Sequence, residues 1–419
     1  MSKRITLLTY GTRGDVEPFI ALAQSLAEAG YRPILAAPRP FHALAEAHQI
    51  PFAGLDGDPA AISAALTDQA GMNPLKMIRF MSAYLYPLAE RVFGQAALAC
   101  QESDAIVHTF LMTYAGHHLA IERGIPDVSA QFFPVFSPTG AYPAPVFPDW
   151  PLGPGYRRST HRLVTFAFRF GSETLYRRLR RSSPNMPPLH AWQLDRKGWI
   201  KTPLLLAYSS RLVPPPAELG ANARLTGFWF PRPCLDWQPT GSLERFLESE
   251  PRPVFIGFGS MSSARHAARL MECLEVIDAQ GLRAVLADGP GFPSPGPLPE
   301  SVCLIEEVPY SWLFPRVAAV VHHGGAGTTG SAACAGVPQV VIPFSADQAF
   351  WGRRAYLAGV APEPIPLRRL SASTFRQALA AAVQGVRMRE AAEALAGEVR
   401  GEPGTAAAIE LIRQVAGPP

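Results

Sequence analysis

The chain has 419 residues, 48% of them apolar and 17% charged, and its formal net charge is +4. This length predicts two domains of ordinary size, the composition excludes an intrinsically disordered chain, and the small net charge gives no reason to expect a nucleic-acid partner. The sequence has no apolar stretch of about 18 residues and no signal-peptide pattern near its start, which favours a cytoplasmic protein without a membrane-spanning helix.

The N-terminal half alternates short apolar runs with amphipathic segments. Strands are expected at 5–10, 33–37, 52–55, 105–109 and 128–132, with helices at 18–29 and 41–48 between the first of them. Buried strands separated by helices predict a parallel sheet that is covered on both faces. The alternation pauses in a Pro-rich stretch, 133–154, resumes with a helix and ends near 204–209.

Clustered prolines then mark a boundary with little regular structure, which places an interdomain linker at about 225–245, between domains at 1–224 and 246–404. A second alternating series follows, with strands expected at 253–257, 283–287, 302–308, 318–322 and 339–343. Two doubly wound sheets joined in this way predict a cleft between the domains as the place for a ligand.

The segment 322–331 is the most informative part of the chain and reads HHGGAGTTGS. A buried strand runs into glycines, and a helix of small residues follows. Glycines let the backbone approach an anion, and the free N–H groups of a helix N-terminus favour a diphosphate. The hydroxyls of Thr328 and Thr329 and a neighbouring histidine can add hydrogen bonds. The same glycines also suit a tight turn that binds nothing, so the loop alone leaves both interpretations open.

A second glycine turn, 257–261, follows the first strand of the same domain. Ligands gather at the carboxyl ends of the strands in such sheets, so Ser260 could reach the same diphosphate. An ordinary strand-to-helix turn would explain this segment equally well.

Four motifs in the same order resemble those of the inverting family 1 glycosyltransferases. They are 10–19 (YGTRGDVEPF), 226–229 (TGFW), 308–314 (VPYSWLF) and 322–329 (HHGGAGTT), the last followed by Asp347 and Gln348. The first is similar to the opening of bacterial antibiotic and sterol glucosyltransferases. The resemblance implies the GT-B fold, in which two Rossmann-like domains with doubly wound parallel sheets face each other across a cleft. The acceptor would bind the N-terminal domain and the nucleotide-sugar the C-terminal one, and a helix in 405–419 would pack back on the N-terminal domain.

Asp15 is the expected general base. It follows the first strand, and the resembling branch has its catalytic aspartate at this point of the motif, whereas the plant branch uses a histidine; no histidine stands near Asp15 in the sequence. A carboxylate is a weak base and would accept the proton as the new bond forms. The position also suits an aspartate that caps the following helix, with Pro18 in the first turn.

The resemblance also assigns the donor side. His323 and the glycine loop would stabilise the departing nucleotide diphosphate, so that the nucleotide-sugar is a co-substrate and no metal or other cofactor is required. Asp347 and Gln348 would hold the sugar hydroxyls, although both also suit a polar helix start. The expected donor contacts are Ser260, Val308, His323, Gly325, Gly327, Thr328, Asp347 and Gln348.

The nucleobase is expected against the segment 308–312, where Val308 would offer backbone groups and Tyr310 or Trp312 an aromatic ring. Either ring could also be ordinary core. The stacking tryptophan of the plant branch has no counterpart at the start of this segment, where Glu306 and Glu307 stand. The choice between a UDP-sugar and a dTDP-sugar therefore stays open.

Two features bear on metal binding. The five cysteines lie far apart and form no CxxC pair, which predicts reduced thiols and neither a zinc site nor a disulfide framework. Asp56, Gly57 and Asp58 spell DxD, the manganese-binding pattern of the other large glycosyltransferase fold. So short a pattern arises often by chance, and Gly57 with Pro59 indicates an exposed turn. No metal site is predicted.

An aromatic run in 132–150 is the expected wall for an apolar acceptor, with Phe133, Phe136, Tyr142 and Phe147 as its contacts. An irregular loop that covers the core is the alternative. Three histidines could flank the acceptor, but each fits a core or surface role better; they are His108, His117 and His118.

The segment 156–181 carries eight arginines and one acid, Glu173, with apolar residues interleaved. Such a helix could contact an anionic membrane and collect a lipid-like acceptor. The preferred interpretation is a solvated basic face with a buried apolar stripe, formed by Leu163, Phe166, Phe170 and Leu175.

Taken together, these observations predict an inverting glycosyltransferase that moves a hexose from a nucleotide-sugar to a hydroxyl of a hydrophobic small molecule, such as a sterol, polyketide, carotenoid or glycolipid. A nucleotide-sugar epimerase of the same architecture would need carboxylates around both faces of the donor. A non-catalytic nucleotide-sugar-binding protein would be favoured if Asp15 proved dispensable.

Overall fold

In a computed structural model of the protein, the residues that can be described are 2–59, 61–62, 84–182, 201–234, 237–259, 264–287, 298–344 and 347–419. They form two compact units. The first comprises Met1–Ala207, Pro215–Arg232 and Pro403–Pro419, and the second comprises Tyr208–Pro214 and Pro233–Glu402. None of the described helices is long and apolar enough to cross a membrane.

The first unit is built on a parallel sheet with the strand order β3-β2-β1-β4-β5-β6-β7. The strands are β1 (Arg4–Leu8), β2 (Arg32–Pro38), β3 (Phe52–Leu55), β4 (Ala105–His108), β5 (Asp127–Gln131), β6 (Leu204–Leu206) and β7 (Ala223–Leu225). The helices are α1 (Arg13–Glu28), α2 (His42–Ala47), α5 (Tyr86–Ala99), α6 (Thr113–Arg123), α7 (Gly153–Ser182) and α15 (Thr405–Ala416).

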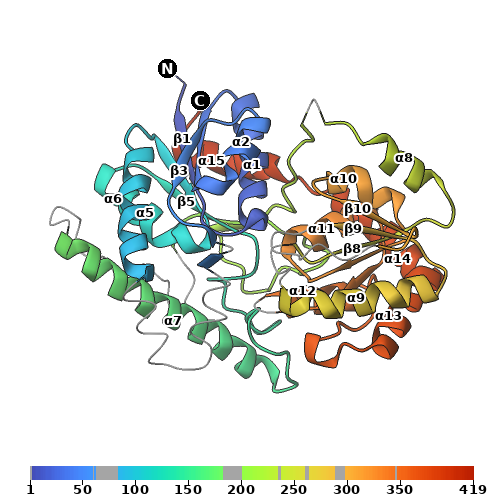
Figure 1. Ribbon diagram of the computed structural model, residues 1–419. Coiled ribbons are helices and arrows are strands. Elements are labelled where there is room, and N and C mark those ends of the chain that lie inside the picture. The colour runs from blue at the N-terminus through green and yellow to red at the C-terminus, as the bar shows by residue number, and fades with distance from the viewer. Residues whose placement is uncertain are drawn as a thin grey trace. The chain divides into compact units, whose positions relative to one another are not determined.

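Successive side chains of β1 are buried on opposite faces of this sheet. Leu7 packs in the core that contains α1 and α15, whereas Leu8 packs in the core that contains α5 and α6. Because both faces are covered, even polar side chains of the strands are buried, among them Thr6, Ser129 and Gln131, as in a doubly wound sheet (Figure 1). The last helix of the chain, α15, lies against α1, and the hydroxyls of Ser25 and Thr405 are 2.7 Å apart.

The second unit has a parallel sheet with the strand order β10-β9-β8-β11-β12. The strands are β8 (Val254–Gly257), β9 (Ala284–Ala287), β10 (Val302–Ile305), β11 (Ala319–His322) and β12 (Gln339–Val341). The helices are α8 (Gly241–Glu248), α9 (Ala264–Ala279), α10 (Tyr310–Leu313), α11 (Ala326–Ala335), α12 (Gln348–Leu357), α13 (Ala372–Gln384) and α14 (Val386–Arg400). One core joins α9 and α13 to the sheet, and another joins α8, α10 and α11 to it. The predicted pair of doubly wound parallel sheets is confirmed.

One boundary differs in a way that matters for the site. The sequence predicted the first helix from residue 18, but α1 begins at Arg13 with Pro18 inside it. Thr12 is the N-cap residue, and Asp15 at the third helical position completes a capping box with it. Asp15 therefore belongs to the first turn of α1 and does not precede the helix.

Candidate functional site

His322 ends β11 and is fully buried. Its Nδ1 accepts a hydrogen bond from the backbone N–H of Gly324 at 3.1 Å, and its Nε2 lies 2.9 Å from the side-chain oxygen of Gln339, to which it donates. Burial lowers the pKa of His322 to about 3, so the imidazole is neutral. Both ring nitrogens thus form hydrogen bonds inside the protein, and the bond to the N–H of Gly324 stabilises the glycine turn.

Gly324 gives this turn its backbone path. Its φ is +92°, and a Cβ atom there would lie 2.7 Å from the backbone oxygen of Gln348 and 2.8 Å from Val341. Only glycine fits such a close approach at positive φ. The turn therefore packs directly on the start of α12, which brings 323–327 and 347–348 together in one place.

The N-terminus of α11 follows the turn. Gly325 is the N-cap residue, and it offers no side-chain cap. The first amide with a partner inside the helix is that of Thr329, which donates to the carbonyl of Gly325 at 2.9 Å. A Cβ on Gly327 would meet no described atom within 4 Å. The N–H groups of 326–328, which have no partner among the residues that the structure describes, and the positive end of the helix dipole make this a suitable place for a phosphate group.

His323 lies beside this helix end. Burial lowers the pKa of His323 to about 4, and among the described residues its buried Nδ1 has no hydrogen-bond partner. The ring also lies 3.4 Å from where a Cβ on Gly259 would be, so the turn after β8 and the turn after β11 flank the same imidazole. A neutral imidazole here can donate one N–H to an anion. Ser260, the predicted contact from the β8 turn, lies outside the described residues.

The two threonines of the loop differ. Thr328 is partly exposed, whereas Thr329 is fully buried with its hydroxyl inside the unit. The expectation that both hydroxyls would add donors to the loop is therefore wrong for Thr329, because the fourth residue of a helix with one buried face turns inward.

Asp347 and Gln348 are tied into the start of α12. Asp347 is its N-cap residue, and its Oδ2 accepts a hydrogen bond from the indole N–H of Trp351 at 2.9 Å. Burial raises the pKa of Asp347. The side-chain oxygen of Gln348, a buried residue, accepts from the backbone N–H of Phe344 at 2.8 Å. Both side chains thus stabilise the helix start beside the glycine turn, and their contact with a sugar stays a prediction.

The segment expected to meet the nucleobase lies between β10 and α10. Val308 is partly buried against the core there. Tyr310 stacks on Phe314 with ring centroids 4.4 Å apart, which makes Tyr310 a member of that core. The guanidinium of Arg316 lies 4.4 Å from the centre of the Trp312 ring. Trp312 is thus held in a cation–π contact.

In the first unit, Asp15 lies at the carboxyl end of β1. Its Oδ2 accepts hydrogen bonds from the backbone N–H of Thr12 at 2.8 Å and from the Thr12 hydroxyl at 3.3 Å. A Cβ atom on Gly11 would collide with the Asp15 carboxylate. The capping alternative is thus realised, and it holds the carboxylate in one orientation at the edge of the sheet.

The DxD segment follows β3. Asp56 pairs with Arg39 at 3.0 Å and with Arg91 at 3.2 Å, so its charge is balanced by two guanidinium groups. Asp58 accepts a hydrogen bond from the backbone N–H of Ala61. Across the described part of the chain, no group of three or more His, Cys, Asp or Glu side chains is placed to hold a metal ion.

The aromatic wall is arranged differently from expectation. Phe136 and Tyr142 are 1% and 2% exposed, so they belong to the interior of the first unit and do not line an open surface. Phe133 and Phe147 are only partly buried. Phe136 packs with two rings that the sequence did not single out, Phe110 at 5.5 Å and Phe168 at 5.4 Å. These partners come from distant segments, and no local pattern identifies them.

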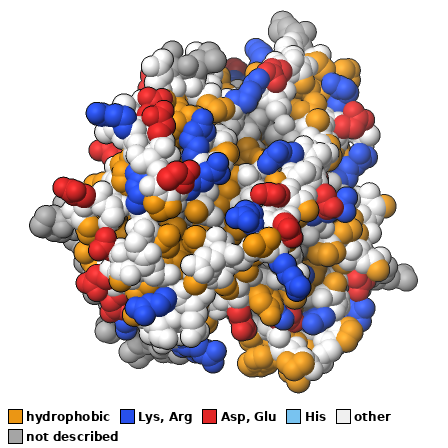
Figure 2. All heavy atoms as spheres, turned by 90° about the vertical axis from the view of Figure 1, so that its right-hand side faces the viewer, with side chains coloured by type: hydrophobic (Ala, Val, Ile, Leu, Met, Phe, Trp, Pro, Cys, Tyr) orange, Lys and Arg blue, Asp and Glu red, His pale blue; other side chains and the backbone are white. Residues whose placement is uncertain are grey.

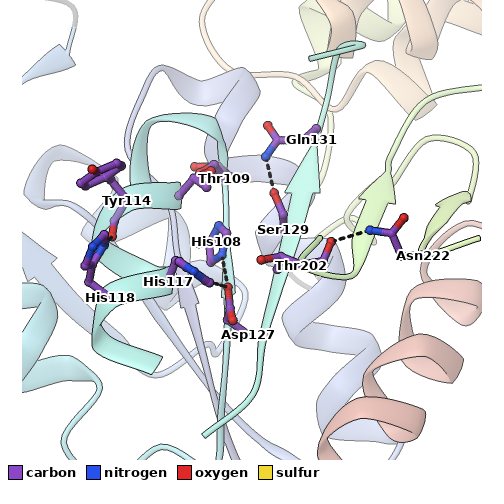
Figure 3. Close-up of polar contacts among 11 residues, drawn as sticks. His108, Thr109, Tyr114, His117, His118, Asp127, Ser129, Gln131, Thr202 and Asn222 are labelled. Carbon is purple, nitrogen blue, oxygen red and sulfur yellow. Dashed lines mark hydrogen bonds and ion pairs between the residues drawn. The ribbon is translucent and has the colours of Figure 1, made fainter. Parts of the chain in front are cut away.

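Two of the three histidines share one carboxylate (Figure 3). His108 Nε2 and His117 Nδ1 both lie 3.0 Å from Oδ2 of Asp127, at the start of β5. Burial disfavours the Asp127 anion, but the hydrogen bonds from both histidines outweigh it and hold the pKa of Asp127 well below its usual range. His118 bonds the carbonyl of Tyr114 at 2.7 Å and packs on Tyr176. The core or surface role favoured by the sequence therefore fits all three, with His108 and His118 buried and His117 partly exposed.

The preferred interpretation of the basic helix is wrong. The stripe expected to be buried is largely exposed, with exposed fractions of 53% for Leu163, 66% for Phe166 and 67% for Phe170. The side of α7 turned toward the protein carries Thr160, His161 and Thr165 in the first half of the helix and Tyr176 and Leu179 in the second half. Polar partners in the loop before α7 and apolar burial nearer its end together decide which face of this helix turns inward.

Two family models match the chain. Residues 5–110 match the N-terminal domain of glycosyltransferase family 28, and residues 269–414 match the C-terminal domain of the erythromycin biosynthesis protein CIII-like family. Sterol 3-beta-glucosyltransferases from Aspergillus clavatus and Neurospora crassa are 34% and 32% identical to it over 98% of this chain. The chain spans 30% and 27% of the length of these two relatives.

Solved structures of glycosyltransferases have a similar fold over nearly the whole length of this chain. The glycotransferase of kitacinnamycin has a TM-score of 0.73 and 20% identity, and each chain covers 100% of the other. The calicheamicin glycosyltransferase has a TM-score of 0.70 and 17% identity, with 99% of this chain and 98% of that one covered. The spinosyn rhamnosyltransferase complexed with thymidine diphosphate has a TM-score of 0.64 and 18% identity over 99% of this chain and 100% of that one.

Proposed function

Because this chain belongs to the family 1 glycosyltransferases of GT-B fold, we propose that it transfers a hexose from a nucleotide-sugar to a hydroxyl group of a hydrophobic small molecule, with inversion at the anomeric carbon. The nucleotide-sugar binds the second unit and the acceptor binds the first. In this proposal neither substrate binding nor sugar transfer requires a metal ion.

The observation that carries the proposal is the open N-terminus of α11 beside a neutral His323. As the bond to the anomeric carbon breaks, negative charge gathers on the nucleotide diphosphate. Backbone N–H groups, the helix dipole and one imidazole N–H are already aimed at that charge, and such preorganised donors are commonly the largest contribution to catalysis. Gly327 leaves room for the phosphates, Gly325 leaves room for the His323 ring beside them, and Thr328 adds a hydroxyl.

Asp15 is the proposed general base. The Thr12 N–H and the absence of a side chain on Gly11 fix the carboxylate at the carboxyl end of β1, where ligands of such sheets collect. The carboxylate takes the proton of the acceptor hydroxyl as that oxygen bonds to the anomeric carbon. General-base catalysis of this kind contributes about 10²–10⁴-fold to the rate.

The relatives favour particular substrates. The curated relatives are named for glucosyl transfer to the 3-beta hydroxyl of a sterol, which favours a glucose donor and a sterol-like acceptor. One structural neighbour is complexed with thymidine diphosphate, so a dTDP-sugar stands beside a UDP-sugar as donor. A sterol-like acceptor partitions into lipid, and we infer that the enzyme takes it from a lipid surface through 156–181.

The test is nucleotide diphosphate release from UDP-glucose and dTDP-glucose with a panel of hydrophobic alcohols that includes a sterol, in the presence of excess EDTA. We expect Asp15→Asn to keep its affinity for the nucleotide and to lose at least about a hundredfold in turnover. Equal turnover in the two proteins would reject Asp15 as the base, and loss of all activity in EDTA would reject the metal-free mechanism.

A further inference from the structure

The first half of the helix α7 buries polar side chains and exposes apolar ones, whereas its second half buries Tyr176 and Leu179. Its inner side buries hydroxyls and an imidazole, because Thr160 Oγ1 accepts from the backbone N–H of Ala144 at 2.9 Å and His161 Nε2 donates to the carbonyl of Tyr142 at 3.0 Å. Its outer side presents Leu163, Phe166 and Phe170, each more than half exposed. A helix that served only the fold would place these side chains the other way round.

These three side chains form one continuous strip, which we call the exposed stripe. Their spacing of three and four residues puts them on one face of the helix, and the rings of Phe166 and Phe170 are stacked with centroids 6.4 Å apart. Trp150, 55% exposed in the preceding segment, stacks on Tyr156 in the first turn of α7. The apolar surface therefore extends for roughly 20 Å along the helix at 1.5 Å per residue.

The charge of α7 indicates what covers the stripe. The helix carries eight arginines and a single acid, Glu173. Arg162 and Arg181 flank the stripe and have no ion-pair partner within the described part of the chain, and the Arg177 side chain is 72% exposed. By contrast, the face drawn in Figure 2 mixes basic and acidic side chains. Four of the eight arginines pair closely with acids, and the remaining ones leave the helix with a positive charge that would repel a second copy and attract anionic headgroups; the closely paired ones are Arg157, Arg158, Arg169 and Arg178.

We propose that α7 is a membrane-docking surface for an anionic lipid bilayer. The exposed stripe enters the boundary between headgroups and acyl chains, and Arg162, Arg177 and Arg181 contact lipid phosphates. The helix lies along the margin of the first unit (Figure 1). Aromatic side chains beside arginines on one amphipathic helix are the usual chemistry of such contacts.

The purpose of this membrane contact rests on the proposed function, because the bilayer would supply an acceptor dissolved in lipid. Membrane binding itself can be measured without enzymatic turnover. The experiment is flotation of the full chain with vesicles of phosphatidylcholine and with vesicles in which part of that lipid is replaced by phosphatidylglycerol. We expect binding to the anionic vesicles only, weakened by salt. The double variant Phe166→Gln/Phe170→Gln should bind at least about tenfold more weakly.

The matched control is Leu98→Gln/Leu357→Gln, which removes two side chains that are 70% and 54% exposed on other helices. It should bind vesicles like the wild type. Equal binding by the stripe variant would overturn the proposal, and so would a wild-type dimer that only the stripe variant abolishes. Turnover of a detergent-dissolved acceptor separates the two hypotheses: vesicle binding without turnover refutes the enzyme assignment alone, and turnover without vesicle binding refutes the docking surface alone.

Discussion

The β11–α11 turn of the second unit and the aromatic layer of the first unit hold their shapes by different means. In the turn, a positive φ at Gly324 and one histidine bonded to two neighbours fix the backbone, and both hydrogen-bond partners of that histidine lie within twenty residues along the chain. In the aromatic layer, Phe136 is fixed by Phe110 and Phe168, which come from separate segments. Local backbone constraints build the first region, and long-range packing builds the second.

The largest expected effect tests the aromatic layer. Phe136→Ala removes a ring that is 1% exposed, and we expect it to lower the free energy of unfolding by about 3–5 kcal/mol. Phe166→Ala removes a ring of the same size that is 66% exposed and should change it by less than about 0.5 kcal/mol. Urea unfolding of both variants measures the difference. Similar losses would mean that the exposed stripe contributes to the fold.

The next effect tests the turn. Gly324→Ala forces a side chain onto positive φ and against the carbonyl of Gln348, and should destabilise the second unit by at least about 2 kcal/mol and abolish nucleotide binding. Gly327→Ala places a methyl group where no described atom lies within 4 Å, so its fold should be kept or stabilised by about 0.5–1 kcal/mol.

Nucleotide titration sharpens this pair. If the phosphates sit on the α11 N-terminus, the new methyl group of Gly327→Ala lowers the affinity for UDP or dTDP at least about tenfold in a fully folded protein. Unchanged nucleotide affinity in Gly327→Ala would reject the proposed phosphate site at this helix end, even if Gly324→Ala abolishes binding.

The same contrast explains how far the sequence could predict the molecule. The alternation of strands and helices and the glycine turn depend on local patterns, and these are visible in a single chain. The roles of Asp15 and His323 came from the family resemblance and stay predictions. The inward turn of Thr329 was missed because the loop motif does not give the helical phase. Phe110 and Phe168 were missed because only the folded chain brings them to Phe136. The exposure of the apolar residues in the first half of α7 was missed because Thr160 and His161 find backbone partners in the preceding loop, which no local pattern shows.

The smallest expected effect is on the pH dependence of stability and concerns His322, which is hydrogen-bonded to the glycine turn. His322 is neutral when folded because burial holds its pKa near 3, whereas in the unfolded chain its pKa is the ordinary one, about 6.5. The unfolded chain therefore binds a proton first as the pH falls, and the second unit should lose roughly 1–2 kcal/mol of stability between about pH 7 and pH 5. Hydrogen exchange of peptides from 319–335 during urea titration follows this loss.

His322→Gln should be less stable than the wild type near neutral pH, but its stability should depend less steeply on pH. The pH dependence that remains would come from His323, because burial also lowers the pKa of that side chain. The matched control is His161→Gln in the first unit, where burial likewise lowers the pKa to about 4. That substitution should leave the pH dependence of the 319–335 peptides unchanged, because its proton is bound in the other unit. If the pH dependence of stability were the same in His322→Gln as in the wild type, protonation of a group other than His322 would have to cause the loss of stability of 319–335 in acid.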